Sequence, residues 1–416
     1  MPADPTPHVP RYLDTTAAVA EFAAAIAGAP ALALDTEGAS FHRFVDRVYL
    51  LQLSTRDETA VIDPLPTGDL APLKGMVEDP AVEIVFHDAD YDLRLLRQDY
   101  GWQVRRIFDT RIAAQLLGYR AFGLAALLER HFGLALDKKF QRADWSLRPL
   151  SEGMLRYAAQ DTMHLLGLRD ALHAELVAKG RWGWAQEEFA RLEATSWGDE
   201  DPAVAYMKLK GARDLTRRGL AVLRELVPWR DGVARDLDRA VFRVVSNEVL
   251  LDIAKAMPSS RSELSAIKGM PRGVLESRGD AVLAAVQRGV AVPDADLPRF
   301  PKAPRFERDP DFDERAARLR TVRDEVAASL ELDPGVLCSR DRLEGIARRQ
   351  PQSMDELLQT PDLRRWQADL LGERLLAALR STPSSVSAAT SAVGTSTAAS
   401  APSARAGRVD DSPYRD

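Results

Sequence analysis

Cysteine is almost absent from this chain: Cys338 is the only one among 416 residues. A lone cysteine excludes an intramolecular disulfide and is typical of proteins that work in a reducing cytoplasm. A membrane-spanning run is also missing, because the Ala-rich stretch 17–34 is interrupted by Glu21 and Pro30. The N-terminus lacks the basic and apolar pattern of a signal peptide. We therefore expect a cytoplasmic protein with no membrane partner.

The chain also lacks an excess of positive charge. Its formal net charge is −6, so nucleic acid would have to be bound through local basic patches rather than by the field of the whole protein. Only 9 of its 56 basic residues are lysines. Arginine can pair bidentately with phosphate, but biased codon composition is the simpler explanation of this excess. The length allows two or three domains of ordinary globular composition.

What the chain does have is four carboxylates and one tyrosine in three separated motifs. Asp35 and Glu37 lie in LALDTEG, Asp92 in VFHDADYDLRLL, and Tyr157 and Asp161 in RYAAQDTMHLL. An Asp-x-Glu pair on a strand places both side chains on one face, because strand side chains alternate. Residues four apart on a helix also share a face. The motifs therefore predict a compact group of acidic side chains.

Clustered carboxylates predict a metal site. Four carboxylates repel one another unless cations neutralise them, and hard oxygen ligands suit Mg²⁺ or Mn²⁺. Two divalent ions would balance the four charges, and two ions roughly 3.5–4 Å apart are the usual apparatus for cleaving a phosphodiester. Each motif alone could be a strand-end turn or an exposed helix face. The apolar strands that precede Asp35 and Asp92 favour the functional interpretation, since they provide a rigid scaffold.

In their order and spacing, these motifs resemble the DEDD superfamily of 3′→5′ exonucleases, in its tyrosine-containing branch. The stretch LDKKFQRADWSLRPLSEGMLRYAAQD, residues 136–161, resembles the ribonuclease D family. Two later helical segments resemble the HRDC domains that follow the nuclease in that family. The resemblance runs from about Leu32 to about Leu379.

This resemblance implies a role for each motif residue. Asp35 would bridge two metal ions, Glu37 and Asp161 would complete the shell of one, and Asp92 would support the other, directly or through water. One ion would activate a water and the other would stabilise the leaving 3′ oxygen. Tyr157 would position the attacking water. A phenol has an ordinary pKa near ~10, so at neutral pH it would orient the water rather than deprotonate it.

The hydrophobic pattern predicts an α/β fold followed by helices. Strands are expected at 31–35, 48–54 and 59–63, close enough for an antiparallel meander, and another strand at 82–88 precedes a helix that carries Asp92. Asp109 is expected to cap the next helix. A meander followed by alternating strands and helices implies a mixed sheet with helices on its faces. This matches the ribonuclease H-like fold that the resemblance implies, with all-α HRDC-type domains after it.

The domain boundaries expected are an exonuclease domain at 1–198, an HRDC domain at 208–291, a second HRDC-like helical domain at 305–380 and a tail at 381–416. The second helical domain repeats the order Ile-Ala, Pro, Glu-Leu of the first, which indicates a diverged copy. The tail is rich in Ser, Thr and Ala and has almost no large apolar residues. It is therefore expected to be disordered.

Two features keep two interpretations, and a third, His87, is expected to have a structural role. In the basic loop at 137–150, Lys138, Lys139, Arg142 and Arg148 surround Trp145; this loop could clamp a phosphate backbone and stack a base, or its tryptophan could simply pack on the fold. His87 is expected to be structural, because hard metals do not need imidazole. The regularly spaced arginines at 217–243 form either a solvated face or a weak RNA-binding surface.

The acidic motifs predict a site for two Mg²⁺ or Mn²⁺ ions, and the resemblance implies a metal-dependent 3′→5′ exoribonuclease of the ribonuclease D type. It would act as a monomer, bind RNA with a single-stranded 3′ end such as tRNA precursors, and release nucleoside 5′-monophosphates. A DNA 3′→5′ exonuclease on the same scaffold is one alternative, because the contacts that read a 2′-hydroxyl cannot be read from sequence. A catalytically silent RNA-binding protein is the other, although all five expected residues are present.

Overall fold

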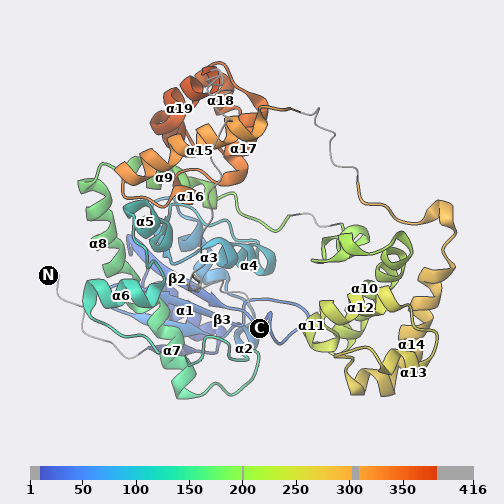
Figure 1. Cartoon of the computed structure of the whole chain (residues 1–416). Coiled ribbons are helices and arrows are strands. Elements are labelled where there is room, and N and C mark those ends of the chain that lie inside the picture. The colour runs from blue at the N-terminus through green and yellow to red at the C-terminus, as the bar shows by residue number, and fades with distance from the viewer. Residues whose placement is uncertain (1–9, 138, 199–200, 302–308, 382–416) are drawn as a thin grey trace, which may run out of the picture.

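A six-stranded mixed sheet organises the first half of the molecule (Figure 1). The computed structural model describes residues 10–137, 139–198, 201–301 and 309–381, so Lys138 and the predicted disordered tail from 382 onward lie outside the described residues. The strand order is β1-β4-β3-β2-β5-β6. The strands are β1 Arg11–Leu13, β2 Ala31–Glu37, β3 Leu50–Ser54, β4 Thr59–Ile62, β5 Glu83–Phe86 and β6 Ile107–Asp109.

The predicted meander and mixed sheet are confirmed. Strands β2, β3 and β4 pair antiparallel, and β5 and β6 add to β2 in parallel. The sequence did not reveal β1, which pairs parallel with β4 at the far edge. A three-residue strand carries no readable period, and β1 is held in part by a long-range hydrogen bond from the Tyr12 hydroxyl to Asp63 (2.6 Å).

Helices cover both faces of this sheet. Leu32 and Leu34 of β2 face the apolar side chains of α1, α3 and α4, whereas Ala33 faces α5, α8 and α9. Asp109 caps α5 as expected, accepting hydrogen bonds from the backbone N–H of Arg111 (2.8 Å) and Ile112 (3.0 Å). The helices are α1 Thr16–Ala25, α2 Pro64–Thr67, α3 Ala71–Glu78, α4 Asp90–Tyr100, α5 Thr110–Leu117, α6 Leu124–Phe132, α7 Glu152–Met163, α8 Leu165–Ala178 and α9 Trp182–Leu192.

Two helical blocks follow and lie on different sides of the sheet domain (Figure 1). The first helical block consists of η1 Pro202–Lys208, η2 Ala212–Asp214, α10 Arg217–Asp236, α11 Val241–Val244, α12 Asn247–Ala256, α13 Arg261–Ser265, α14 Arg272–Ala291 and η3 Asp294–Asp296. The second helical block consists of α15 Phe312–Ser329, α16 Pro334–Leu337, α17 Arg340–Arg349, α18 Met354–Leu358 and α19 Arg365–Arg380.

The two blocks repeat the same local structure. Helices α12 and α17 both begin after a serine that caps them and end at a left-handed residue, Met257 in the first block and Gln350 in the second, each with φ of 49°. The next helices, α13 and α18, begin after the capping serines Ser260 and Ser353. The internal repeat seen in the sequence is therefore a repeat of structure.

Several arginines of the first helical block contact other parts of the block itself. Arg217 donates to the carbonyl of Leu297 (2.8 Å) and Arg218 to that of Val290 (2.9 Å), which ties the start of α10 to the residue after η3 and to the end of α14. Arg230 is buried and donates to the Asn247 side chain (2.7 Å). Of these three arginines, buried Arg230 belongs neither to a solvated face nor to an RNA surface, and Arg217 and Arg218 hold the backbone of the block.

The second helical block is docked on α9 of the sheet domain. The Glu187 carboxylate accepts the backbone N–H of Arg365 (2.6 Å) and Trp366 (3.0 Å), and Glu188 accepts the Trp366 indole N–H (2.9 Å). The rings of Trp184 and Trp366 stack with centroids 5.0 Å apart. Two carboxylates at the N-terminus of α19 are also favoured by the helix dipole.

Candidate active site

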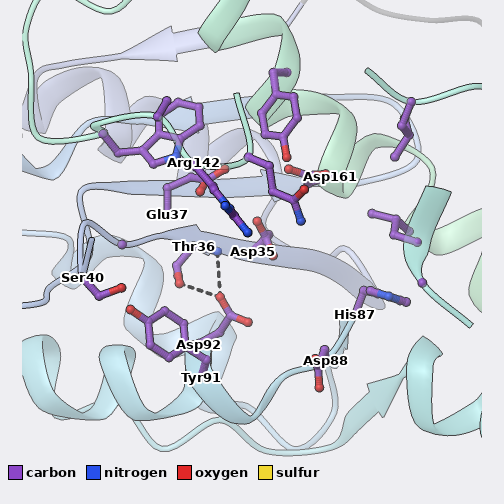
Figure 2. A pocket seen from close by; sticks show the side chains of 18 of the residues that line it. Asp35, Thr36, Glu37, Ser40, His87, Asp88, Tyr91, Asp92, Arg142 and Asp161 are labelled. Atoms are coloured by element: carbon purple, nitrogen blue, oxygen red, sulfur yellow. Dashed lines mark hydrogen bonds between the residues drawn. The ribbon is translucent and has the colours of Figure 1, made fainter. Parts of the chain in front are cut away.

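Three of the predicted carboxylates meet on one face of the sheet. Asp35, Glu37 and Asp161 offer carboxylate oxygens that all lie within 4.8 Å of one another. Asp35 and Glu37 project from the end of β2 on the same face, and Asp161 projects from α7, which packs against that face. Figure 2 shows Glu37 and Asp161 on one side of the β2 ribbon. The predicted Asp-x-Glu geometry therefore occurs in the folded chain.

The position of Asp161 follows from how α7 is seated. Ser151 caps the helix, and its buried face presents Ala158, Ala159 and Thr162 to the sheet. The Thr162 hydroxyl lies 2.7 Å from the Ser54 hydroxyl of β3. Small residues allow a close approach, and the buried hydrogen bond fixes the register of the helix on the sheet.

Asp92 approaches from the opposite face of β2. It lies in the first turn of α4, and its Oδ1 accepts hydrogen bonds from the backbone N–H (2.9 Å) and the hydroxyl (2.5 Å) of Thr36. Thr36 stands between Asp35 and Glu37 in sequence, so its side chain points to the other face. Figure 2 shows Asp92 beside Thr36, across the ribbon from Glu37. Asp92 is thus not part of the three-carboxylate group, although its charge still acts on it.

Burial and mutual repulsion raise the pKa of all four carboxyl groups. For Asp35 burial is the larger cause and the charge of Asp161 the second; for Glu37 burial is followed by the charge of Asp35. Burial, then the charge of Asp35, raises the pKa of Asp92. Burial and the charge of Asp92 raise the pKa of Asp161 to about 7. Burial of the charged carboxylates and the repulsion between them are both unfavourable. A bound divalent cation would offset both effects.

Tyr157 lines the same cavity, one helical turn before Asp161. Its ring stacks on Trp145 with centroids 6.0 Å apart and meets Phe140 edge-on at 6.1 Å. Burial, and then the charge of Asp161, raise the pKa of its phenol. The hydroxyl therefore keeps its proton at neutral pH, and the aromatic contacts fix where that hydroxyl points.

The basic loop divides into a structural part and a part that faces the cavity. Arg148 donates to buried Asp63 (2.8 Å) and to the carbonyl of Tyr49 (2.9 Å), so it anchors the loop to the sheet. Trp145 is 2% exposed and packs under Tyr157, which excludes it as a free stacking surface. Arg142 lines the cavity, and Figure 2 shows its side chain reaching toward Asp35. Of these three residues, only Arg142 keeps a position suited to substrate phosphate.

His87 has the surroundings of a structural histidine. Its Nδ1 lies 2.9 Å from the Thr110 hydroxyl, and burial lowers its pKa to about 4, so the ring is neutral near pH 7. It lines the cavity near Asp88, whose carboxylate pairs with Arg111. Gln52 is fully buried and lies opposite Asp35 in the β2–β3 ladder.

Some residues shape the site without being acidic, and no sequence pattern indicated them. Thr36 holds Asp92, yet a threonine on a strand gives no signal by itself. Gly38 follows the acidic pair, and a Cβ there would lie 2.7 Å from the Tyr91 hydroxyl and 2.8 Å from Asp46 Oδ1. A side chain at residue 38 would therefore displace the Tyr91 hydroxyl and the Asp46 carboxylate. Phe41, 46% exposed, also lines the cavity.

Together these residues enclose a cavity of about 760 Å³, with the acidic group among its lining residues. This is within the range of pockets that take a small ligand or one end of a chain.

Comparison with known proteins gives the family. A family model described as 3′-5′ exonuclease matches residues 10–177, and a model described as HRDC domain matches 219–286 and again 312–379. A ribonuclease D of Granulibacter bethesdensis is 32% identical over 354 residues, covering 84% of this chain and 87% of that protein. The chain belongs to the ribonuclease D family. As a member of this family it is a 3′→5′ exoribonuclease, and its acidic group indicates the use of divalent metal.

Further relatives are similar to this ribonuclease D family member over most of its length. The ribonuclease D of Escherichia coli K12 is 32% identical over 290 residues, or 70% of this chain and 77% of that protein. The crystal structure of Escherichia coli RNase D, described as an exoribonuclease involved in structured RNA processing, has a TM-score of 0.71 at 28% identity and covers 90% of this chain and 99% of that one. A Bifidobacterium adolescentis protein reaches a TM-score of 0.78 at 27% identity, covering 91% and 99%.

Among the residues that the structure describes, no helix combines the length and the apolar character that crossing a bilayer requires.

The raised carboxyl pKa values predict how metal and pH change stability. A carboxyl group whose folded pKa is raised adds stability at acid pH, and this is lost progressively as pH rises to the folded value, about 7 for Asp161. The metal-free protein should therefore melt at a lower temperature at pH 8 than at pH 5.5. Mg²⁺ at 100 times its dissociation constant should add about 2.7 kcal/mol to the free energy of unfolding. This corresponds to a rise in Tm of roughly 5–10 °C for a domain of this size.

Differential scanning calorimetry with EDTA and then with Mg²⁺ checks this. Asp161→Asn should raise the Tm of the metal-free protein at pH 8 and reduce the response to Mg²⁺. A matched change outside the acidic group, Asp170→Asn, should keep the response, because Asp170 is paired with Arg56 (2.6 Å) on an exposed surface. An Mg²⁺ response that survives in Asp161→Asn would contradict the assignment of the metal to this group.

Proposed function

We propose that the protein removes nucleotides one at a time from the single-stranded 3′ end of structured RNA, tRNA precursors being the expected class, by two-metal-ion hydrolysis. Each step would break the bond between phosphorus and the 3′ oxygen of the preceding nucleotide and release a nucleoside 5′-monophosphate. The observation that carries this proposal is the group of Asp35, Glu37 and Asp161 in a cavity sized for a chain end. Asp92, held by Thr36, completes the set of four carboxylates.

The carboxylates would hold the ions, with Asp35, Glu37 and Asp161 as the compact group and Asp92 supporting it from across β2. Bound divalent ions would supply the positive charge that activates a water and stabilises the leaving oxygen. Tyr157 keeps its proton and would orient the attacking water through its hydroxyl. Arg142 would bind a nonbridging phosphate oxygen, because guanidinium pairs well with phosphate.

The preference for structured RNA is supported by a relative. The Escherichia coli RNase D structure is described as that of an exoribonuclease involved in structured RNA processing, and it covers 90% of this chain. We extend that substrate class to this protein and keep the prediction of a monomer. A cytoplasmic location stays a prediction that depends on the single cysteine.

A labelled-oligonucleotide assay tests the proposal. Purified protein with Mg²⁺ or Mn²⁺ should shorten a 5′-labelled single-stranded RNA in steps of one nucleotide, and should release the label of a 3′-labelled RNA at once as a 5′-monophosphate. A tRNA precursor with a 3′ trailer should be trimmed and then persist near the mature length. Internal fragments at early times, or label released first from the 5′ end, would contradict the exonucleolytic direction.

The same assay decides between the alternatives. A matched DNA strand, degraded as fast as RNA, would favour the DNA exonuclease. RNA bound with no product in either metal would favour the silent binding protein. An EDTA control should abolish hydrolysis in all cases where hydrolysis occurs.

A further inference from the structure

The loop that follows β2 joins the candidate active site to the first helical block. This loop spans residues 38–49, and Gly38, Ser40, Phe41 and His42 line the cavity that contains the carboxylates. From there the chain reaches α11 of the first helical block (Figure 1). The block is therefore attached at a segment that also forms a wall of the site.

Several contacts make this attachment. The backbone N–H of Ala240 donates to the carbonyl of His42 (3.2 Å), and Arg43 pairs with Asp238 (3.2 Å). Asp238 also accepts the backbone N–H of Phe44 (3.4 Å). Two arginines of the block reach the loop as well: Arg243 donates to the carbonyl of Phe41, and the Arg235 guanidinium lies 5.2 Å from the centre of the Phe44 ring.

Two phenylalanines meet where the cavity joins the block. Phe41 and Phe242 lie edge to face, with ring centroids 6.3 Å apart, and they are 46% and 47% exposed. Phe41 lines the cavity. Trp145, by contrast, is buried beneath Tyr157. Two exposed phenylalanine rings in contact beside the cavity form a flat apolar surface on which a base could stack.

We propose that Phe41 and Phe242 form a stacking surface for bases of the single-stranded RNA that leads into the carboxylate site, so that the first helical block completes the substrate site. This inference rests on the proposed function. Stacking on aromatic rings accepts every base, because each has a π-face. That tolerance suits an enzyme that must grip a new sequence after every nucleotide it removes. The contacts of Asp238, Ala240 and Arg243 hold the two rings in place.

The main test is Phe242→Ala, compared on a long and a short substrate. For a single-stranded RNA octamer, KM should rise about 10–100-fold, the loss expected for one stacked base, while kcat changes less than about twofold. The p-nitrophenyl ester of uridine 5′-monophosphate has a single base, which the cavity itself would hold. Its hydrolysis should be unchanged. An octamer KM within twofold of the wild-type value would overturn the proposal.

Conservative variants separate stacking from packing. Phe242→Trp and Phe242→Tyr should restore octamer binding, whereas Phe242→Leu, which keeps apolar volume, should not. If Phe242→Leu binds the octamer like the wild type, the ring is a spacer and stacking is excluded. Asp238→Asn tests the support of the ring pair: residue 238 has φ of 45°, which Asn tolerates, and the change removes the charge that pairs with Arg43. A smaller rise of octamer KM is expected.

A binding measurement separates this inference from the proposed function. Fluorescence anisotropy of the labelled octamer in EDTA does not require hydrolysis. Weaker binding by Phe242→Ala supports the stacking surface even if the wild type fails to hydrolyse RNA, which would refute the proposed chemistry alone. An octamer with one abasic position, moved along the strand, should locate the stacked base. If no abasic position weakens binding of the octamer to the wild-type protein, the stacking surface is excluded, whatever the hydrolysis assay shows.

Discussion

Replacing Asp35 by asparagine should reduce RNA hydrolysis in Mg²⁺ by about 10²–10³-fold. Removing a single electrostatic stabiliser of a transition state costs about 10²–10³ in rate, and this change removes one of three carboxylates that meet within 4.8 Å. Asparagine has nearly the same volume, and burial already raises the pKa of Asp35, so a neutral side chain should not destabilise the metal-free fold. Single-turnover hydrolysis of a 5′-labelled RNA octamer measures the effect.

Asp88→Asn is the matched control. It makes the same chemical change in the same cavity, at a residue paired with Arg111 and outside the acidic group. Residue 88 has φ of 71°, which asparagine tolerates. Its rate should stay within a few-fold of the wild type. Near-normal turnover of Asp35→Asn, or an equal loss in both variants, would mean that Asp35 does not hold the metal.

The sheet could be predicted because its strands carry local signals. Residues 31–35, 48–54 and 59–63 are apolar runs separated by short polar segments, and they form β2, β3 and β4. Their antiparallel order follows from the shortness of the connections. Strand β1 has neither length nor period, and its pairing with β4 depends on residues about 50 positions away. Local patterns do not contain that information.

The shared faces of the acidic residues were predictable because their spacing is local. Asp35 and Glu37 share a strand face, and Tyr157 and Asp161 share a helix face, whatever the rest of the fold does. Which face Asp92 would occupy was not predictable, since it depends on where α4 packs and on the hydrogen bonds from Thr36. The separation of Asp92 from the group of Asp35, Glu37 and Asp161 is therefore a property of the tertiary structure.

Basic residues were harder to interpret than acidic ones. Arg148 stands in a basic loop, yet it binds Asp63, 85 positions earlier in the chain, and no local pattern links the two. Nor did any pattern indicate that Glu187 and Glu188 would hold the second helical block at Trp366. A charged side chain shows its partner only when the fold brings the two together. Removal of the second helical block would therefore leave Glu187 and Glu188 of α9 without these partners.

Replacing Tyr157 by phenylalanine should lower kcat by about 10²–10⁴-fold with little change in RNA affinity. That is the usual cost of losing a positioned acid–base or orienting group. The substitution keeps the ring contacts with Trp145 and Phe140, so the fold of the loop and of α7 should persist. Burial and the charge of Asp161 raise the pKa of the phenol, so the lost group is a neutral hydroxyl that orients water.

The pH profile distinguishes this role from general-base catalysis. If the hydroxyl only orients water, the residual activity of Tyr157→Phe should keep the shape of the wild-type pH profile, at a lower level throughout. If Tyr157 acted as a base, the wild type would gain rate as pH approached the ionisation of the phenol, and the variant would not. Tyr119→Phe is the matched control, because its hydroxyl binds Glu175 (2.7 Å) outside the cavity and its loss should leave kcat unchanged. An unchanged kcat in Tyr157→Phe would reduce that residue to a packing partner of Trp145 and leave orientation of the water to the carboxylates.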